Sequence, residues 1–166
     1  KTGAEIGMVQ IGNEITNGML GITTNRDLGE SYKGVWGDKL KSKQVNKYLS
    51  AGAKAVREVS DALVALQLET PNGDKFKEIM DTWERDNVDY DILGSSFYPY
   101  WSTGEKANTP ETLTKVQKLA ADYGKLFVAL ETAWTTTVKD ADGTPNSIGE
   151  WDDTSSYSVS AQVQAD

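Results

Sequence analysis

The stretch Met8-Val9-Gln10-Ile11-Gly12-Asn13-Glu14 decides the fold, because it is an apolar, strand-like run that ends in an acidic side chain. The stretch Leu126-Phe127-Val128-Ala129-Leu130-Glu131 repeats this pattern later in the chain. In parallel α/β sheets, chemistry is done at the carboxyl ends of the strands, where such side chains point into a cleft. Two carboxyl groups that face each other across a pocket are the pair of catalytic groups with which most glycosidases cleave a glycosidic bond. Alternatively, each glutamate caps a following helix or pairs with a nearby lysine.

Strand-like and helical patterns alternate along the whole chain. Strands are predicted at residues 7–12, 63–68, 91–97 and 126–130. Helices are predicted from about residue 42 to 59, from 74 to 85, and from the Thr109-Pro110 capping pair to about 124. Their buried faces would be Val45, Leu49, Ala53, Val56 and Val59; Phe76, Ile79, Met80 and Trp83; and Leu113, Val116, Leu119 and Ala120. Repeated βα units of this kind predict an α/β fold with a parallel sheet.

The connections favour a (β/α)8 TIM barrel over a doubly wound open sheet. Long segments follow the strand ends, at residues 16–39, 98–108 and 132–157, whereas the helix-to-strand connections are short. No strand is followed by a glycine-rich dinucleotide motif or a phosphate-binding loop, which argues against the nucleotide-binding open sheet. Because four βα units cannot close a barrel of eight, we expect residues 1–166 to form one incomplete catalytic domain.

Composition excludes several classes of function. The chain has 166 residues and a formal net charge of −8, from 25 acidic and 17 basic residues, which disfavours nucleic acid and anionic membranes as partners. There is no apolar run long enough to span a bilayer and no signal-peptide pattern, so we expect a soluble domain. There is neither cysteine nor histidine. Carboxylates, tyrosines and lysines are therefore the residues left for acid and base chemistry.

Four segments in order resemble a known family. These are residues 10–14 with 17–20, residues 94–101, residues 129–134 and residues 140–146. The first resembles the acid/base strand of the clan A retaining glycosidases, and together they resemble glycoside hydrolase family 53, the endo-β-1,4-galactanases. The resemblance spans the whole chain, which would supply strands four to seven of the barrel and the start of the seventh helix.

The resemblance implies roles for the residues at the strand ends. Glu14 would be the general acid/base and Glu131 the nucleophile of a double displacement, which needs the two carboxyl groups about 5 to 5.5 Å apart. Asn13 would bond the 2-hydroxyl of the sugar under attack, although a strand-end turn also suits an asparagine. Either Tyr98 or Tyr100 would orient the nucleophile, and the sequence leaves this choice open.

Aromatic residues beyond the strand ends are candidates for sugar-binding platforms. Trp101 and Trp134 directly follow strand ends, and Trp36 lies in the first long loop. Each of them suits either stacking against a galactose ring or packing within its loop. Trp83 lies on the predicted inner face of a helix and is assigned to the core.

Alternating oxygen-bearing residues in the last loop suggest calcium. Asp140, Asp142, Thr144 and Asn146 offer hard oxygen ligands at every second position, with Thr144 acting through its carbonyl. The family often binds Ca²⁺ in this loop, commonly with histidine where Thr144 stands. The pattern is not an EF-hand, and Asp-x-Asp-Gly is also an ordinary turn sequence.

The function that the resemblance implies is a secreted, retaining endo-galactanase that cuts β-1,4-galactan of plant pectin and works as a monomer at full length. Another clan A hydrolase, acting on xylan, mannan or cellulose, is the first alternative. The second is a catalytically silent, sugar-binding barrel fragment.

Overall fold

A parallel four-stranded sheet forms the centre of the molecule. The computed structural model describes residues 3, 5–101, 108–139, 142–144, 148 and 158–162. The strands of this sheet are β1 (Met8–Gln10), β4 (Leu63–Glu69), β5 (Ile92–Ser96) and β6 (Leu126–Glu131). They lie in the order β1-β4-β5-β6, and each neighbouring pair is parallel. All four agree with the predicted strands to within a few residues.

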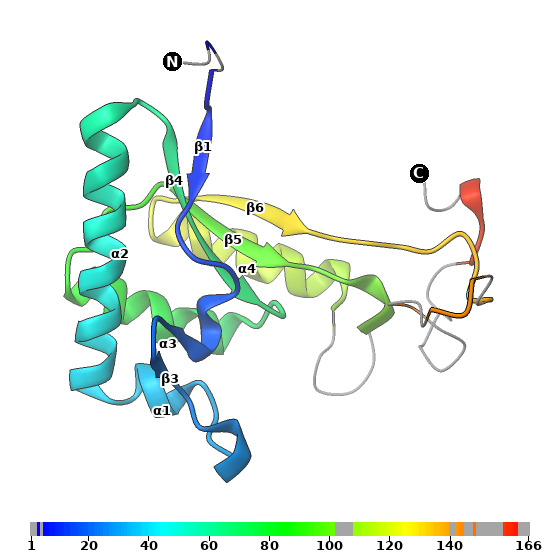
Figure 1. The fold of residues 1–166 in the computed structure, drawn as a ribbon, viewed down its shortest axis with the longest axis horizontal. Helices are drawn as coiled ribbons and strands as arrows, with labels where there is room; N and C mark the ends of the chain where they lie inside the picture. The colour runs from blue at the N-terminus through cyan, green and yellow to red at the C-terminus, as the bar shows by residue number, and fades with distance from the viewer. Residues whose placement is uncertain are drawn as a thin grey trace.

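Each strand of this sheet pairs with the one that follows it in the chain. A doubly wound sheet would reverse direction at a switch point, and the order of these strands contains no such reversal. Three helices connect the strands: α2 (Lys39–Val59), α3 (Gly73–Arg85) and α4 (Pro110–Asp122). They pack side by side, α2 on α3 and α3 on α4, along the sheet (Figure 1). The order and layering are those of consecutive units of a (β/α) barrel.

The core lies between the sheet and this helix layer. Alternate residues of β4, namely Val64, Leu66 and Leu68, are fully buried against the helices. Their partners are the predicted helical faces, including Val45 and Leu49 of α2; Phe76, Ile79, Met80 and Trp83 of α3; and Val116 and Ala120 of α4. Leu113, predicted on the buried face of α4, is only half-buried and does not belong to this core cluster, and one other member of the predicted faces is wrong. Val59 is 84% exposed, because it is the last residue of α2 and lies at the edge of the helix layer.

Side-chain caps define where the three helices begin. Oδ1 of Asp38 accepts from the backbone N–H of Leu40 and Lys41, so α2 begins three residues earlier than predicted. Asn72 caps α3 through the N–H of Lys75. Thr109 caps α4, with proline at the first helical position as the sequence indicates. In the part of the chain that is described, no helix is long and apolar enough to cross a membrane.

The long segment after β1 contains structure that the sequence did not predict. It holds the short 3-10 helices η1 (Ile15–Asn17) and η2 (Arg26–Leu28), a hairpin of β2 (Gly18–Met19) and β3 (Ile22–Thr23), and α1 (Lys33–Trp36). These elements are too short to carry a readable period.

The face of the sheet opposite the helices is more polar. It carries Gln10 of β1, Gln67 of β4 and Ser96 of β5, which are joined by hydrogen bonds through Gln67. Regular alternation in β6 would turn Leu130 toward this face and Glu131 toward the helices. A register irregularity between Ser95 and Ser96, however, pairs Ser96 with Glu131, and the Glu131 carboxylate bonds Gln67. The irregularity therefore brings this carboxylate to the polar face.

Candidate active site

Glu14 lies in a turn whose backbone is in the left-handed region. Its φ and ψ are 45° and 53°, and Gly12, two residues earlier, has a φ of 78°. Residues other than glycine seldom adopt this conformation, and strain of this kind is concentrated at functional sites. The backbone N–H of Glu14 donates to Oε1 of Gln67 at 3.1 Å, which holds the turn over the sheet. Within the described residues, the Glu14 carboxylate caps no helix and forms no ion pair, so neither alternative role holds there.

Both carboxylate oxygens of Glu131 are held by donors. Oε1 accepts from Nε2 of Gln67 at 2.6 Å, and Oε2 accepts from the hydroxyl of Tyr98 at 2.9 Å. The backbone carbonyl of Glu131 accepts from the N–H of Phe97 at 2.8 Å. Two donors fix the plane of a carboxylate, so this side chain has a defined direction.

Gln67 joins the two glutamates. Its side chain is fully buried, and its Oε1 also accepts from Nε2 of Gln10 at 2.6 Å. One side chain therefore contacts the backbone of the Glu14 turn and the carboxylate of Glu131, which puts this turn and this carboxylate at the same end and face of the sheet. Gln67 was not among the residues predicted from the sequence. The signal that could have found it is a polar side chain within the buried, apolar strand β4.

The pKa of Tyr98 is affected by both glutamates. Burial raises the pKa of Tyr98 to about 12; its hydrogen bond to Glu131 and the negative charges of Glu131 and Glu14 act in the same direction. The phenol is therefore a neutral hydrogen-bond donor at ordinary pH. Tyr98 makes the contact to the candidate nucleophile that the sequence left open between Tyr98 and Tyr100. The Tyr100 ring is buried and packs against that of Tyr98, with 5.5 Å between ring centroids.

Asn13 lies beside this network. Its side chain is exposed, and its Oδ1 accepts from Nε2 of Gln10 at 3.3 Å. An exposed amide next to Glu14 is accessible to a ligand. Gln10 thus contacts both Asn13 and Gln67, and it too was not predicted from the sequence as a site residue.

The candidate aromatic platforms have different surroundings. Trp134 is half-buried and lines a hollow of about 380 Å³ together with Pro99, Thr132 and Ala133, and its Nε1 donates to the carbonyl of Ser158 at 3.1 Å. Trp36 instead belongs to the core: it is buried, donates to the carbonyl of Thr16 at 2.7 Å and packs edge-on against Trp83. The side chain of Trp101 lies outside the described residues.

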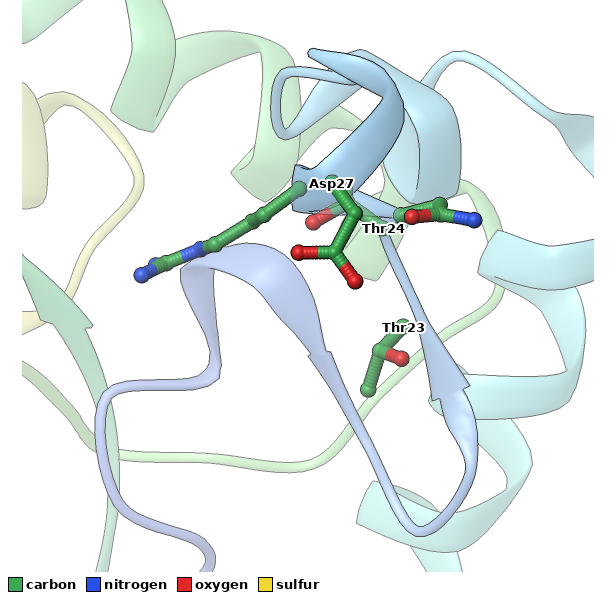
Figure 2. Close-up of a pocket in the computed structure, with 5 residues that line it drawn as sticks. Thr23, Thr24 and Asp27 are labelled. Atoms are coloured by element: carbon green, nitrogen blue, oxygen red, sulfur yellow. The ribbon is translucent and has the colours of Figure 1, made fainter.

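A third carboxylate, which the sequence analysis did not single out, ends strand β4. Oε1 of Glu69 accepts from Nδ2 of Asn17 at 2.7 Å and from Nη2 of Arg26 at 3.2 Å. Because it is paired with a cation, Glu69 is better suited to holding the loop after β1 than to acid/base work. Arg26 also lines a polar hollow of about 530 Å³ with Thr23, Thr24, Asn25 and Asp27 (Figure 2).

The predicted calcium ligands are only partly described. Asp142 and Thr144 are exposed, and Oδ1 of Asp142 accepts from the N–H of Thr144 at 2.9 Å, as in an ordinary Asx-turn. Asp140 and Asn146 lie outside the described residues. Among the residues that are described, no group of three or more acidic side chains is gathered to hold a metal ion.

Known proteins resemble this chain over nearly its whole length. The family model described as "Glycosyl hydrolase family 53" matches residues 1–166. An endo-beta-1,4-galactanase of Bacillus subtilis is 37% identical over 168 residues, which cover 99% of this chain and 34% of the relative. The chain thus spans about a third of that relative's length.

Solved structures agree with this likeness. The Ignisphaera aggregans GH53 catalytic domain matches with a TM-score of 0.73 and 30% identity, over 96% of this chain and 40% of that one. A structure of two fungal beta-1,4-galactanases matches with a TM-score of 0.64 and 20% identity, over 86% of this chain and 41% of that one, a likeness of fold alone. The fold is therefore that of a (β/α)8 barrel, of which the chain supplies only a part.

Proposed function

The chain belongs to glycosyl hydrolase family 53, and from this premise we propose that the intact protein is a retaining endo-acting hydrolase of β-1,4-galactan. Glu131 is the proposed nucleophile and Glu14 the proposed acid/base. The galactanase names of the relatives support the substrate. The polar face at the ends of β1 and β6 supports the site.

The proposed reaction has two displacements at the anomeric carbon. In the first, a carboxylate oxygen of Glu131 attacks this carbon while the Glu14 carboxylic acid gives its proton to the departing glycosidic oxygen, so that a glycosyl ester forms and the bond to the leaving sugar breaks. In the second, the Glu14 carboxylate takes a proton from water, the water oxygen attacks the same carbon, and the ester bond breaks. Two inversions give net retention.

The observation that carries the proposal is the pair of donors on Glu131. Gln67 and Tyr98 hold one oxygen each, so the group meets the requirement of a nucleophile for a fixed direction of approach. The Glu14 charge acts on the same Tyr98 hydroxyl, which supports a shared site for the two carboxyl groups. Asn13, next to Glu14, is the proposed partner of the sugar 2-hydroxyl, and Trp134 a proposed platform for a ring.

Product analysis tests the proposal. The intact protein is incubated with β-1,4-galactan and, in parallel, with xylan, mannan and cellulose, and the new reducing ends are followed by chromatography and by NMR of the anomeric proton. We expect short galacto-oligosaccharides whose new ends are first formed in the β configuration. Cleavage of another polymer in preference to galactan would contradict the substrate, and initial α products would contradict the mechanism.

Calcium and secretion are parts of the same proposal. Asp140, Asp142, Asn146 and the carbonyl of Thr144 offer the hard oxygen donors that Ca²⁺ prefers, and the ion would stabilise the loop that carries them. We expect the Tm of the intact protein to be higher in CaCl₂ than in EDTA, and we expect Asp142→Ala to make this difference smaller. An equal Tm in CaCl₂ and EDTA would contradict the calcium site. Secretion follows from the substrate, because a polysaccharide is met outside the cell.

A further inference from the structure

We propose that Gln67 is a positioning residue: its side-chain amide aims the Glu131 carboxylate and ties this aim to the turn that carries Glu14. The inference rests on the proposed hydrolase function. Gln67 lies outside both strand-end motifs. In the proposed mechanism it forms no bond with the substrate and acts through Glu131 and the Glu14 turn.

The amide of Gln67 uses its full hydrogen-bonding capacity. Its two Nε2 protons have acceptors in Oε1 of Glu131, at 2.6 Å, and Oγ of Ser96, at 3.0 Å. The two lone pairs of its Oε1 have donors in Nε2 of Gln10, at 2.6 Å, and the N–H of Glu14, at 3.1 Å. A buried amide with four partners has one stable orientation.

This orientation cannot be reversed without cost. Turning the amide over would place Oε1 against the negatively charged Glu131 and would place the NH₂ group against the N–H of Glu14, which is also a donor. Both contacts would be repulsive, and the Gln67 side chain is fully buried, where such contacts cost more than at the surface. A primary amide also does not titrate between pH 2 and 12, so Gln67 donates to Glu131 at every working pH.

The bonds of Gln67 connect the whole width of the sheet. From β4, the side chain reaches Gln10 in β1, Ser96 in β5 and Glu131 in β6. Backbone pairing connects only neighbouring strands, whereas the bond to Glu131 connects β4 with a strand two positions away. A shift of the Glu14 turn relative to Glu131 would therefore stretch the bond from the N–H of Glu14 to Gln67 or the bond from Gln67 to Glu131.

The variant Gln67→Met tests the proposal, because methionine keeps the length and volume of the side chain and removes both donors and the acceptor. The intact parent and variant are treated with a 2-deoxy-2-fluoro galacto-oligosaccharide probe with an activated leaving group, and the rate of labelling of Glu131 is measured by peptide mass spectrometry. A misaligned nucleophile should be labelled about 100-fold more slowly, with a KM for galactan within about 3-fold of the parent value.

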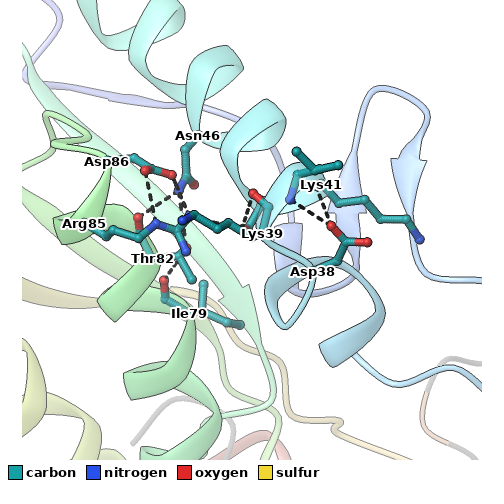
Figure 3. A network of polar contacts seen from close by, with 10 residues as sticks. Asp38, Lys39, Lys41, Asn46, Ile79, Thr82, Arg85 and Asp86 are labelled. Carbon is teal, nitrogen blue, oxygen red and sulfur yellow. Dashed lines mark hydrogen bonds and ion pairs between the residues drawn. The ribbon is translucent and has the colours of Figure 1, made fainter.

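Asn46→Ala is the matched control. Asn46 is also a fully buried amide, and it links α2 to the carbonyl of Thr82 and to Asp86 of the α3 end, away from the polar face of the sheet (Figure 3). Its loss should lower the Tm and leave the labelling rate at 25 °C within about 2-fold of the parent rate. Gln67→Met must therefore differ from this control in rate, whatever its Tm.

The outcomes separate this proposal from the proposed function. If the parent is not labelled on Glu131, the hydrolase assignment fails. If the parent is labelled and folded Gln67→Met is labelled at the parent rate, Gln67 has no positioning role. Should Gln67→Met not fold, Ser96→Ala removes one acceptor and keeps Gln67; labelling slowed about 5-fold supports the role, and an unchanged rate overturns it.

Discussion

The hydroxyl of Tyr98 donates a hydrogen bond of 2.9 Å to Oε2 of Glu131, although the two residues are 33 positions apart in the chain. Tyr98 follows the end of β5 and Glu131 ends β6, so pairing of neighbouring strands brings the donor to the acceptor. The bond leaves Tyr98 protonated and the carboxylate oriented. Replacing Tyr98 by phenylalanine would remove this contact and keep the aromatic ring.

Glu131→Ala should abolish turnover of galactan. Without the carboxylate no glycosyl ester forms, and kcat should fall by roughly 10⁴- to 10⁶-fold, as for loss of other catalytic nucleophiles. Reducing-sugar release by the intact protein, with circular dichroism as a check on folding, measures this. Hydrolysis by the folded variant at the parent rate would remove Glu131 from the mechanism.

Glu14→Ala should give a different pattern. Activity on galactan should fall by about 10²- to 10⁴-fold, whereas activity on an aryl glycoside whose leaving group needs no proton should fall less. Azide should restore turnover of the aryl substrate by taking the place of activated water. The product would be a β-galactosyl azide, identified by NMR; a variant that azide does not rescue would contradict the acid/base role.

Tyr98→Phe should lower kcat by about 10- to 100-fold, because a hydrogen bond to a charged group is lost while the ring remains. It should also change the alkaline limit of folding. Tyr98 ionises near pH 10 when unfolded and near pH 12 when folded, so it contributes stability that is full below about pH 10 and is lost as the pH rises to about 12.

The alkaline effect is measured by urea unfolding at about pH 9 and pH 11. The variant should lose less free energy of unfolding over this interval than the parent does. Tyr48→Phe is the control, because it removes a phenol that lies away from Glu131 on α2. Equal losses in parent and Tyr98→Phe would mean that folding does not raise the pKa of this phenol.

Asp86→Asn should make folding less sensitive to acid. Hydrogen bonds from Arg85, at 2.7 Å, and from Asn46, at 2.8 Å, lower the pKa of Asp86 to about 2 from an ordinary value of 3.8. Its stabilising contribution is therefore present above about pH 4 and is lost as the pH falls toward 2. The parent should lose more stability than the variant between those pH values in urea unfolding, and parallel curves would contradict this.

Gly94→Ala should destabilise the sheet by about 1 to 3 kcal/mol. An added Cβ at Gly94 would lie 2.2 Å from Cδ1 and 3.0 Å from Cγ of Leu130, on the same face as the Glu131 carboxylate. The double variant Gly94→Ala with Leu130→Ala should recover part of this loss relative to the sum of the single changes. A double-mutant cycle by thermal unfolding measures the coupling, and strict additivity would contradict the contact.

The main architecture could be predicted because it depends on the spacing of apolar residues and on the residues that start and end each element. The apolar faces of α2, α3 and α4 and the Thr109-Pro110 start of α4 are local signals that tertiary packing did not override. Glu14 and Glu131 were readable for a similar reason, since each ends an apolar run. The hairpin and short helices after β1 were not, because elements of two to four residues have no period.

The hydrogen-bonding partners within the site could not be predicted in the same way. Gln67 acts through residues 53 and 64 positions away in the chain, and such contacts depend on strand order and register. Trp36 is a further example: its place in a loop left stacking on a sugar and packing within the loop both open, and its burial against Trp83 follows from how α1 packs on the helix layer. Strand register is a property of paired strands, so no single segment reveals it.

The register irregularity at Ser96 decides which side of the sheet the last side chain of β6 meets. Ser95 pairs with Ala129 and Ser96 pairs with Glu131, so β6 carries one extra residue, Leu130, at this point. A β6 of the same length that paired without the irregularity would place Leu130 opposite Ser96 and turn Glu131 toward the helices. Such a protein would keep a covered sheet and lose its acid from the sugar-facing side.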